Sequence, residues 1–494
     1  MAKNTKIIGS LLVATALWLT GTAYVSSNTK SYLDSYVKKS NAIYKANGME
    51  MSVENFEKGF FSSEAEVKVD FTNQELRAFI SKTLKLPIKV NYTIENGPLF
   101  FNNGLGFGLS RIHNRVNLSD YYVDTGKMKE YLKGDIILTS NTSIDFRNNA
   151  NFEGSTNKII VDIDGEDLEI SPVQISGNMD VETFEGKMHM AVDSVFVEHN
   201  DEFFKANDIS MEADIKEVFA NGFYLGDFVF NVEQVNTKGV DLPFSLENAK
   251  VKMRVNIDKN EDETVNLDFK VEGDAGNSKL PEAYAFLKKA ELTYALHGMR
   301  LEGVLAFQDF TKELQAREAD ILSRLKPSQT GELDMKALAE LEKMQVEMQE
   351  GMMLRMAGLL KKDSTSITFE TNLVDKENKK SSISLNMGYV GDMDLPTDGK
   401  ALKKKFKEEL FNLITLDFKV DLEKEYISNL PLQLQQELAG QIQMGAMFGI
   451  VKENNNSYSF DANYKPKTLT VNGTDRSEML QMLEMGLFQS QAAF

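Results

Sequence analysis

The sequence predicts an α+β fold: an extended, twisted antiparallel β-sheet, partly covered by a helical hairpin and C-terminal helices, with an N-terminal transmembrane helix. Three observations support this fold class. The stretch from Ile7 to Val25 is apolar and carries no charge. Apolar and polar residues then alternate with period two through much of the chain, which is typical of half-buried antiparallel strands. Between about Glu332 and Lys362 the apolar period changes to that of a helix.

The segment Ile7–Val25 is long enough, at about 1.5 Å per residue, to cross the ~30 Å hydrocarbon core of a bilayer. A cleaved secretory signal is the alternative, because Gly21 and Ala23 form a small-x-small site. The apolar core is longer than that of most signals, and Trp18 and Tyr24 lie near its end, where amphipathic rings favour the headgroup layer. We therefore expect an uncleaved anchor. A buried core helix is a third interpretation.

Charge and composition exclude several partners and chemistries. The net charge is −19, from 74 acidic and 55 basic residues, and no concentrated basic face is visible, so we expect no nucleic-acid partner. The chain has no cysteine, which excludes disulfides, thiolate metal sites and thiol catalysis. Lys3 and Lys6 precede the apolar segment, and this short side is expected in the cytoplasm with the bulk of the chain exported.

Strand and helix patterns follow in order after the apolar segment. Ser31–Ala46 has helical spacing and is expected to end at Asn47-Gly48. The alternating segments predict strands at 65–71, 188–192, 249–257, 265–271, 367–373, 383–389, 416–422 and 458–464.

A helical hairpin is predicted between the strands, with almost no strand expected from Pro281 to Lys362. Pro327 and Gly331 separate a helix at about 310–325 from one at 332–362. One stripe of the second helix is apolar and rich in methionine: Leu338, Leu341, Met344, Met348, Met352 and Met356. Further helices are expected at 400–413, 432–448 and 477–487, the last capped by Asp475. These patterns divide the chain into residues 1–28 (anchor or signal), 29–280 (strand-rich exported domain), 281–365 (helical insert) and 366–494 (strands and helices).

Short glycine and aromatic motifs carry a family resemblance. FEKGFFSSEA (Phe56–Ala65), IENGPLF (Ile94–Phe100) and GFYLGDFVF (Gly222–Phe230) resemble signatures of the YdgA-like family of bacterial envelope proteins. Asn96 stands where the family pattern has a histidine, so no imidazole role is carried over to that position. The resemblance implies a single N-terminal inner-membrane anchor and a periplasmic body in a Gram-negative cell. It implies no established reaction or ligand.

Candidate functional motifs have simpler structural interpretations. DIDGEDLE (Asp162–Glu169) lacks the glycine and glutamate positions of a calcium loop and instead predicts a hairpin that turns at Asp164-Gly165. The loop DKNEDE after Ile257 also fails the calcium pattern, and GLGFG (Gly104–Gly108) is not a dinucleotide motif. The four histidines, at positions 113, 189, 199 and 297, show no metal-ligand spacing.

The sequence therefore names no catalytic, cofactor-binding or metal-binding residue and predicts a non-enzymatic protein. A one-sided sheet must cover its apolar face with helices, another sheet, a partner or a lipid. Our leading hypothesis is a sheet-lined groove that holds or passes a lipid or another amphipathic ligand. The alternatives are a scaffold that self-associates as a homo-oligomer, and an envelope hydrolase. The 23 methionines fit core filling, an adaptable groove or, third, copper binding.

Overall fold

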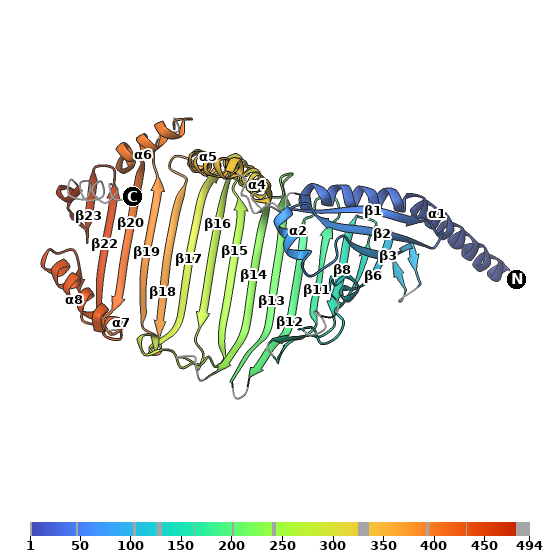
Figure 1. Ribbon diagram of the computed structural model, residues 1–494, viewed down its shortest axis with the longest axis horizontal. Coiled ribbons are helices and arrows are strands. Elements are labelled where there is room, and N and C mark those ends of the chain that lie inside the picture. The colour runs from blue at the N-terminus through green and yellow to red at the C-terminus, as the bar shows by residue number, and fades with distance from the viewer. Residues whose placement is uncertain are drawn as a thin grey trace. The chain divides into compact units, whose positions relative to one another are not determined.

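The computed structural model describes residues 2–45, 48–101, 105–124, 126, 131–163, 165–199, 202–239, 244–324, 335–391, 395–430 and 432–480. The chain divides into two compact units. Unit 1 consists of Met1–His199, Asn207–Gly226 and Gln315–Leu338, and unit 2 of Asn200–Ala206, Asp227–Leu314 and Ala339–Phe494. The predicted α+β class is confirmed: antiparallel sheet dominates and several helices accompany it (Figure 1). The four-part division by sequence pattern stays a prediction.

In unit 1, helix α1 (Ala2–Tyr44) runs for 43 residues and continues beyond the strands at its N-terminal end (Figure 1). It ends close to the predicted stop, and Gly48 there has a φ of +76°, a conformation that favours glycine. The helix packs on one face of the first strands, with Val25 and Val37 buried in that contact.

The transmembrane prediction for Ile7–Val25 is not supported. Among the residues that the structure describes, no helix is long and apolar enough to cross a membrane. The end of the segment instead packs within the protein: Thr22 and Val25 are buried, and Gly21 lies so close to Pro98 that a Cβ would be 3.0 Å from its Cδ. The predicted span is therefore corrected, since from Gly21 onward one face of the helix contacts the protein's own sheet.

The strands of unit 1 pair in the order β1-β2-β3-β6-β7-β8-β11-β12, all antiparallel. Their bounds are β1 (Met49–Glu57), β2 (Ser62–Phe71), β3 (Ile88–Asn96), β6 (Ser110–Asn117), β7 (Ile137–Ile144), β8 (Asn149–Thr156), β11 (Val173–Asp180) and β12 (Gly186–His199). The hairpin predicted in DIDGEDLE is confirmed as β9 (Ile159–Ile163) and β10 (Glu166–Ile170), with Asp164 outside the described residues.

Shorter elements complete this part of the chain. They are α2 (Gln74–Ile80), the hairpin β4 (Leu99–Phe100) and β5 (Gly106–Phe107), and the 3-10 turn η2 (Leu118–Tyr121). The long strands β13 (Glu202–Val218) and β14 (Tyr224–Lys238) follow β12 along the chain.

In unit 2, consecutive strands form an antiparallel run in the order β15-β16-β17-β18-β19-β20-β22-β23. Their bounds are β15 (Ala249–Lys259), β16 (Thr264–Asp274), β17 (Leu287–Arg300), β18 (Ser366–Asp375), β19 (Lys380–Tyr389), β20 (Ile414–Glu423), β22 (Ser457–Lys465) and β23 (Thr468–Val471). The two-residue strands β21 (Lys452–Glu453) and β24 (Thr474–Asp475) pair with β22 and β23. Every strand predicted in this part of the chain is present.

The helices of unit 2 connect strand ends. Helices α4 (Leu301–Arg324) and α5 (Met335–Leu359) join β17 to β18, α6 (Gly399–Leu413) joins β19 to β20, and α7 (Lys424–Ser428) and α8 (Leu432–Met447) follow β20. The helices predicted at 400–413 and 432–448 are thus confirmed. The 3-10 turns are η3 (Glu282–Tyr284) and η4 (Ser477–Met479), and most of the helix predicted at 477–487 lies outside the described residues.

The predicted helical hairpin is present, but its extent differs. Helices α4 and α5 pack antiparallel: a Cβ on Gly303 would lie 2.4 Å from the carbonyl oxygen of Gly358, and the ring of Phe310 lies against Gly351. In the methionine stripe Met344 is buried, whereas Met356 is exposed. Pro327 and Gly331 fall outside the described residues.

The expectation of almost no strand from Pro281 to Lys362 is wrong. Leu287–Arg300 forms β17, in the middle of the unit 2 sheet. Ala290, Leu292, Tyr294 and Leu296 alternate with polar residues for most of its length, so the period-two signal was present next to the stronger helical pattern.

Candidate functional site

The two N-terminal motifs meet in unit 1 around the side chain of Asn96. The Asn96 amide nitrogen donates to the carbonyl oxygens of Gly59 (3.0 Å) and Phe60 (3.2 Å), and it lies 3.2 Å from the hydroxyl of Ser63. Asn96 and Ser63 are both buried. Because a buried amide is stable only when its hydrogen bonds are made, these contacts fix the β1–β2 turn against the end of β3.

Helix α1 joins the same polar cluster. The hydroxyl of Thr29 lies 2.8 Å from Asn96 Oδ1, and the hydroxyl of Ser26 donates to the carbonyl oxygen of Gly59 across 2.7 Å. Ser26 and Thr29 are one helical turn apart and both are buried. The motif residues therefore have a structural role, which is to dock α1 on the sheet.

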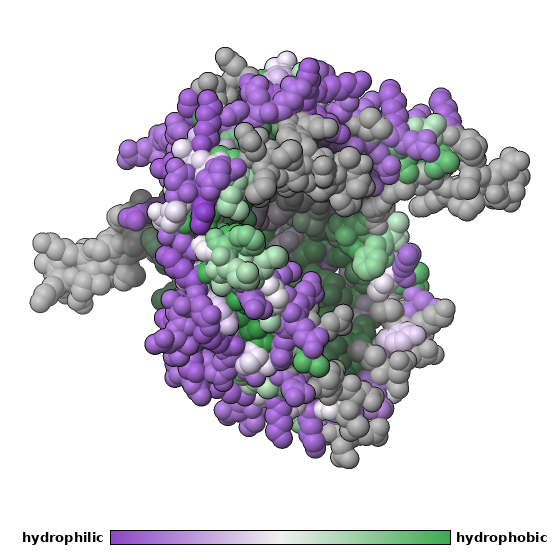
Figure 2. All heavy atoms as spheres, turned by 90° about the vertical axis from the view of Figure 1, so that its left-hand side faces the viewer, coloured by the Kyte–Doolittle hydropathy of each residue, from purple (hydrophilic) through white to green (hydrophobic). Residues whose placement is uncertain are grey.

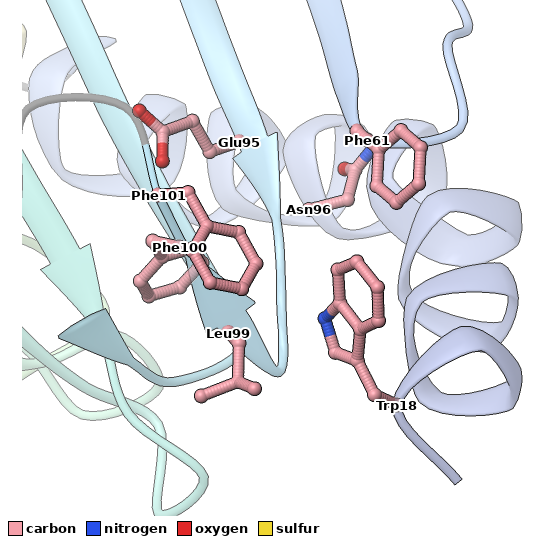
Figure 3. Close-up of a pocket in the computed structure, with 7 residues that line it drawn as sticks. All are labelled: Trp18, Phe61, Glu95, Asn96, Leu99, Phe100 and Phe101. Atoms are coloured by element: carbon pink, nitrogen blue, oxygen red, sulfur yellow. The ribbon is translucent and has the colours of Figure 1, made fainter. Parts of the chain in front are cut away.

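A small aromatic pocket of about 290 Å³ opens beside this cluster (Figure 3). Its lining comes from α1, the β1–β2 turn, β3 and β4: Trp18, Phe61, Glu95, Asn96, Leu99, Phe100 and Phe101. The Trp18 ring stacks on Phe61 and meets Phe101 edge-on, each with 5.5 Å between ring centroids. The buried indole nitrogen of Trp18 has no hydrogen-bond partner among the described residues.

Glu95 lines this pocket and is almost fully buried, with 4% of its surface exposed. Its Oε1 is 3.0 Å from His113 Nε2, and His113 Nδ1 is 2.6 Å from Asn141 Oδ1. Both contacts are satisfied when the ring is protonated on both nitrogens, or when Asn141 presents its amide nitrogen instead. Local sequence patterns do not predict these contacts, because they depend on the cross-strand register that joins β3, β6 and β7.

The other motifs behave as structural elements. His189, His199 and His297 each lie beside a carboxylate of a neighbouring strand rather than beside another histidine. Within the described part of the chain, no three His, Asp or Glu side chains lie close enough together to hold a metal ion. In the GLGFG segment, Gly106 and Gly108 permit close approach, since a Cβ on Gly108 would lie 2.7 Å from the carbonyl oxygen of Ile144.

The apolar face of unit 2 is the largest candidate site. Residues that are directly paired across β15, β16, β17, β18, β19, β20 and β22 form continuous rows on one face of the sheet. The central row consists of Val255, Phe269, Tyr294, Phe369, Leu385, Phe418 and Ala462. Two flanking rows consist of Ile257, Leu267, Leu296, Ile367, Met387, Leu416 and Tyr464, and of Met253, Val271, Leu292, Thr371, Ile383, Val420 and Phe460.

The opposite face of the same strands is polar. One row on that face consists of Arg254, Lys270, Thr293, Glu370, Ser384, Lys419 and Asp461. Because successive side chains of a strand point to opposite faces, apolar side chains lie on one face and polar side chains on the other along these rows. An apolar face of this kind is ordinarily the core side of a sheet and is covered by another layer.

The apolar face of unit 2 is only partly covered. Most residues of its three rows are only half-buried, and Tyr294 and Phe369, adjacent in the central row, remain 38% and 39% exposed. The helices lie at the ends of the strands, α4, α5 and α6 at one end and α7 and α8 at the other (Figure 1). Figure 2 shows hydrophobic side chains inside a hollow, and hydrophilic side chains on the outer surface beside it.

Neighbouring strands are about 4.8 Å apart, so seven strands give this face a width of roughly 29 Å. The polar groups in the three rows are the hydroxyls of Thr371, Tyr294 and Tyr464, and the Tyr464 hydroxyl already donates to the carbonyl oxygen of Phe411. The surface offers dispersion contacts and exclusion of water, and almost no hydrogen bonds.

Comparison with protein families identifies one family that covers most of the chain. Residues 1–478 match the family described as "Bacterial protein of unknown function (DUF945)". The chain belongs to this family. No curated protein sequence and no solved structure gives a significant match. The family description gives no activity, ligand or cellular location.

Proposed function

We propose that this protein binds the acyl chains of a lipid on the apolar face of unit 2, as a non-enzymatic component of the bacterial cell envelope. The observation that carries the proposal is that the central row is only partly covered: Tyr294 and Phe369 are adjacent in it and partly exposed. Exposed apolar surface of this extent on a soluble body is unfavourable by about 25 cal/mol per Å². A bound apolar ligand removes that cost.

A lipid fits this surface better than a peptide does. A peptide in an extended form needs partners for its backbone N–H and C=O groups, and the interior strands of this sheet already pair theirs with each other. Acyl chains need no hydrogen bonds and adapt to leucine, isoleucine, methionine and phenylalanine side chains. The polar row on the opposite face keeps the sheet soluble while the apolar face is occupied.

The envelope location rests on two sequence features. The motifs at Phe56–Ala65 and Ile94–Phe100 resemble the YdgA-like family, whose members are held at the inner membrane with a periplasmic body. Lys3 and Lys6 before an uncharged apolar run fit a chain that is directed to a membrane. We therefore propose that the body lies in the periplasm, close to the inner membrane.

The absence of cysteine makes a direct test possible. Leu385 points to the apolar face and its neighbour Asn386 to the polar face, so Leu385→Cys and Asn386→Cys form a matched pair on β19. With lipid bound, Leu385→Cys is expected to lose reactivity toward a soluble thiol reagent, and to regain it when lipid is removed. Asn386→Cys is expected to react equally in both states.

Two outcomes contradict the proposal. Unchanged reactivity of Leu385→Cys with lipid bound means that lipid binds elsewhere. A Leu385→Cys thiol that is unreactive without lipid means that the protein itself covers this face.

A scaffold that associates with a second copy is the other candidate, and the end of α8 favours it. Met444, Met447 and Phe448 are 56%, 80% and 64% exposed there. On this alternative the mass in solution rises with protein concentration, and Met447→Ser abolishes the increase while lipid binding is unchanged.

A further inference from the structure

One edge of the unit 1 sheet carries an unusual concentration of exposed aromatic side chains. In an antiparallel run of strands, alternate connections lie at the same edge. The connections β1–β2, β3–β6 and β7–β8 therefore share one edge, and α1 passes it near Trp18.

Each of the three connections contributes apolar side chains, which together we name the aromatic rim: Phe60, Phe61, Phe101, Leu105, Phe107 and Phe146. Leu105 and Phe107 are 79% and 70% exposed, and Phe61 and Phe101 more than half. The rings contact one another, with 4.8 Å between the centroids of Phe60 and Phe61 and 5.0 Å between those of Phe107 and Phe146. Trp18 joins Phe61 to Phe101, so the rim continues onto α1.

The structure holds these turns in place by their backbones. The carbonyls of Gly59 and Phe60 are fixed by Asn96, and the turn at Phe146 is fixed by Asp145, whose Oδ1 accepts from the backbone nitrogens of Arg147 (2.8 Å) and Asn149 (2.9 Å). The rings are therefore presented on ordered turns, although burying them in the core would be more favourable. Such an arrangement marks a surface that contacts something apolar.

We propose that the aromatic rim docks on the surface of a lipid bilayer, with its rings in the headgroup and upper acyl layer and the strands of unit 1 standing end-on to the membrane. This contact is separate from lipid binding on the apolar face of unit 2 and involves the other unit of the chain. The result is a body positioned at the membrane surface by three turns and one helix.

Two features favour a bilayer over a protein partner. The rim consists of phenylalanine and leucine and adjoins Trp18, residue types that form the membrane-facing side of interfacial segments, and they come from separate turns. In addition, α1 continues past the rim toward its N-terminus, and its sequence from Ile7 to Leu17 carries no charge. An uncharged run that leaves from the same edge extends the apolar contact.

The cysteine-free chain again allows a site-resolved test. Phe61→Cys, Phe107→Cys and Phe146→Cys each place one thiol on a different connection of the rim, and each takes a polarity-sensitive fluorophore. Phe79→Cys is the matched control, because Phe79 is 71% exposed on α2, which follows the opposite end of β2. The probes are read in the full chain with phosphatidylcholine vesicles, with and without brominated acyl chains.

Docking predicts a blue shift and quenching by brominated lipid at all three rim positions and neither at Phe79. Protein that binds vesicles while its rim probes stay in water overturns the proposal, since attachment is then through the helix alone. A concentration-dependent blue shift without vesicles also overturns it and assigns the rim to contact with a second copy.

A variant test covers the case in which labelling disturbs the turns. Phe61→Ser combined with Leu105→Ser and Phe107→Ser removes three side chains that are each more than half exposed, so the fold is expected to persist, and vesicle partitioning is expected to fall by roughly tenfold or more. Phe79→Ser is expected to leave it unchanged. Lipid protection at Leu385→Cys is expected to survive in the triple variant, which separates failure of the rim from failure of the proposed function. Unchanged vesicle partitioning in the triple variant contradicts the rim proposal.

Discussion

The side-chain amide of Asn96 at the end of β3 donates a hydrogen bond to the carbonyl oxygen of Gly59 in the β1–β2 turn, across 3.0 Å. These residues are 37 positions apart, and each belongs to one of the two short motifs that suggested a family. The two motifs thus form one structural unit, in which the β1–β2 turn and the end of β3 are hydrogen-bonded to each other and contact α1. Their hydrogen bonds position the turn that carries Phe60 and Phe61 of the aromatic rim.

Replacing Asn96 should destabilise unit 1. In Asn96→Ala the carbonyl of Phe60 loses its hydrogen bond from Asn96, and a buried group left unsatisfied costs about 1–3 kcal/mol. The carbonyl of Gly59 keeps its bond from Ser26, and the hydroxyl of Thr29 keeps its bond to the carbonyl of Val25, so these two losses cost less. Denaturant unfolding followed by the fluorescence of Trp18, the single tryptophan, measures the loss. Asn91→Ala, at an exposed position of the same strand, is the control. Equal stability of the two variants would show that the Asn96 contacts do not support the fold.

A methyl group at Gly59 should displace the β1–β2 turn. A Cβ there would lie 1.8 Å from the carbonyl oxygen of Ser62, a contact that only a backbone shift can relieve. Gly59→Ala is expected to lower the melting temperature and to change the Trp18 fluorescence, because Phe60 and Phe61 move with the turn. Gly440→Ala in α8, where a Cβ meets nothing within 4 Å, should be neutral or stabilising. A Gly59→Ala protein with native fluorescence and stability would refute this account of the turn.

Ionisation of the Tyr92 phenol should destabilise unit 1 at strongly alkaline pH. Burial raises the pKa of Tyr92 to about 12, whereas an unfolded tyrosine has a pKa of about 10. The folded state therefore favours the protonated phenol. The contribution of Tyr92 to the free energy of unfolding is complete below about pH 10 and is lost as the pH rises toward 12. Unfolding free energies from pH 9 to 12 should fall less steeply in Tyr92→Phe than in the natural chain. Parallel curves would contradict the assignment.

Replacing one aromatic side chain of the central row by serine should reduce lipid affinity more than it reduces the stability of the fold. Phe369 is 39% exposed, so Phe369→Ser removes ligand contacts while giving up only part of a core contact. We expect a several-fold loss of lipid affinity, on the order of 1 kcal/mol or more. Thr368→Ser, which alters the polar face of the same strand, is the control. If both variants bind lipid equally, the ligand does not contact the central row.

The sequence predicts most strands of unit 2 correctly because each has a strict period of two, as in Val265 to Val271 and Leu416 to Leu422. It fails at β17, where a neighbouring helical stripe obscures the alternation of Leu292, Tyr294 and Leu296. The length, apolar composition and flanking residues of Ile7–Val25 predict a membrane-spanning helix, but they cannot show that Thr22 and Val25 are buried within the protein.

Local patterns also could not reveal either candidate surface. The apolar rows exist only because Tyr294 is paired with Phe369, and Phe369 with Leu385, and this register depends on long-range contacts. The contact of Glu95 with His113 likewise depends on the pairing of β3 with β6. A sequence shows which residues share a strand face, but not which of those faces stays open.

The most direct test of the central claim is native mass spectrometry of the full chain, purified from membranes without a delipidating wash, in the natural form and as Phe369→Ser. The account predicts a stoichiometric lipid on the natural protein and markedly less on the variant. A natural protein that is folded and carries no lipid, or a lipid that is retained equally by both, would contradict it.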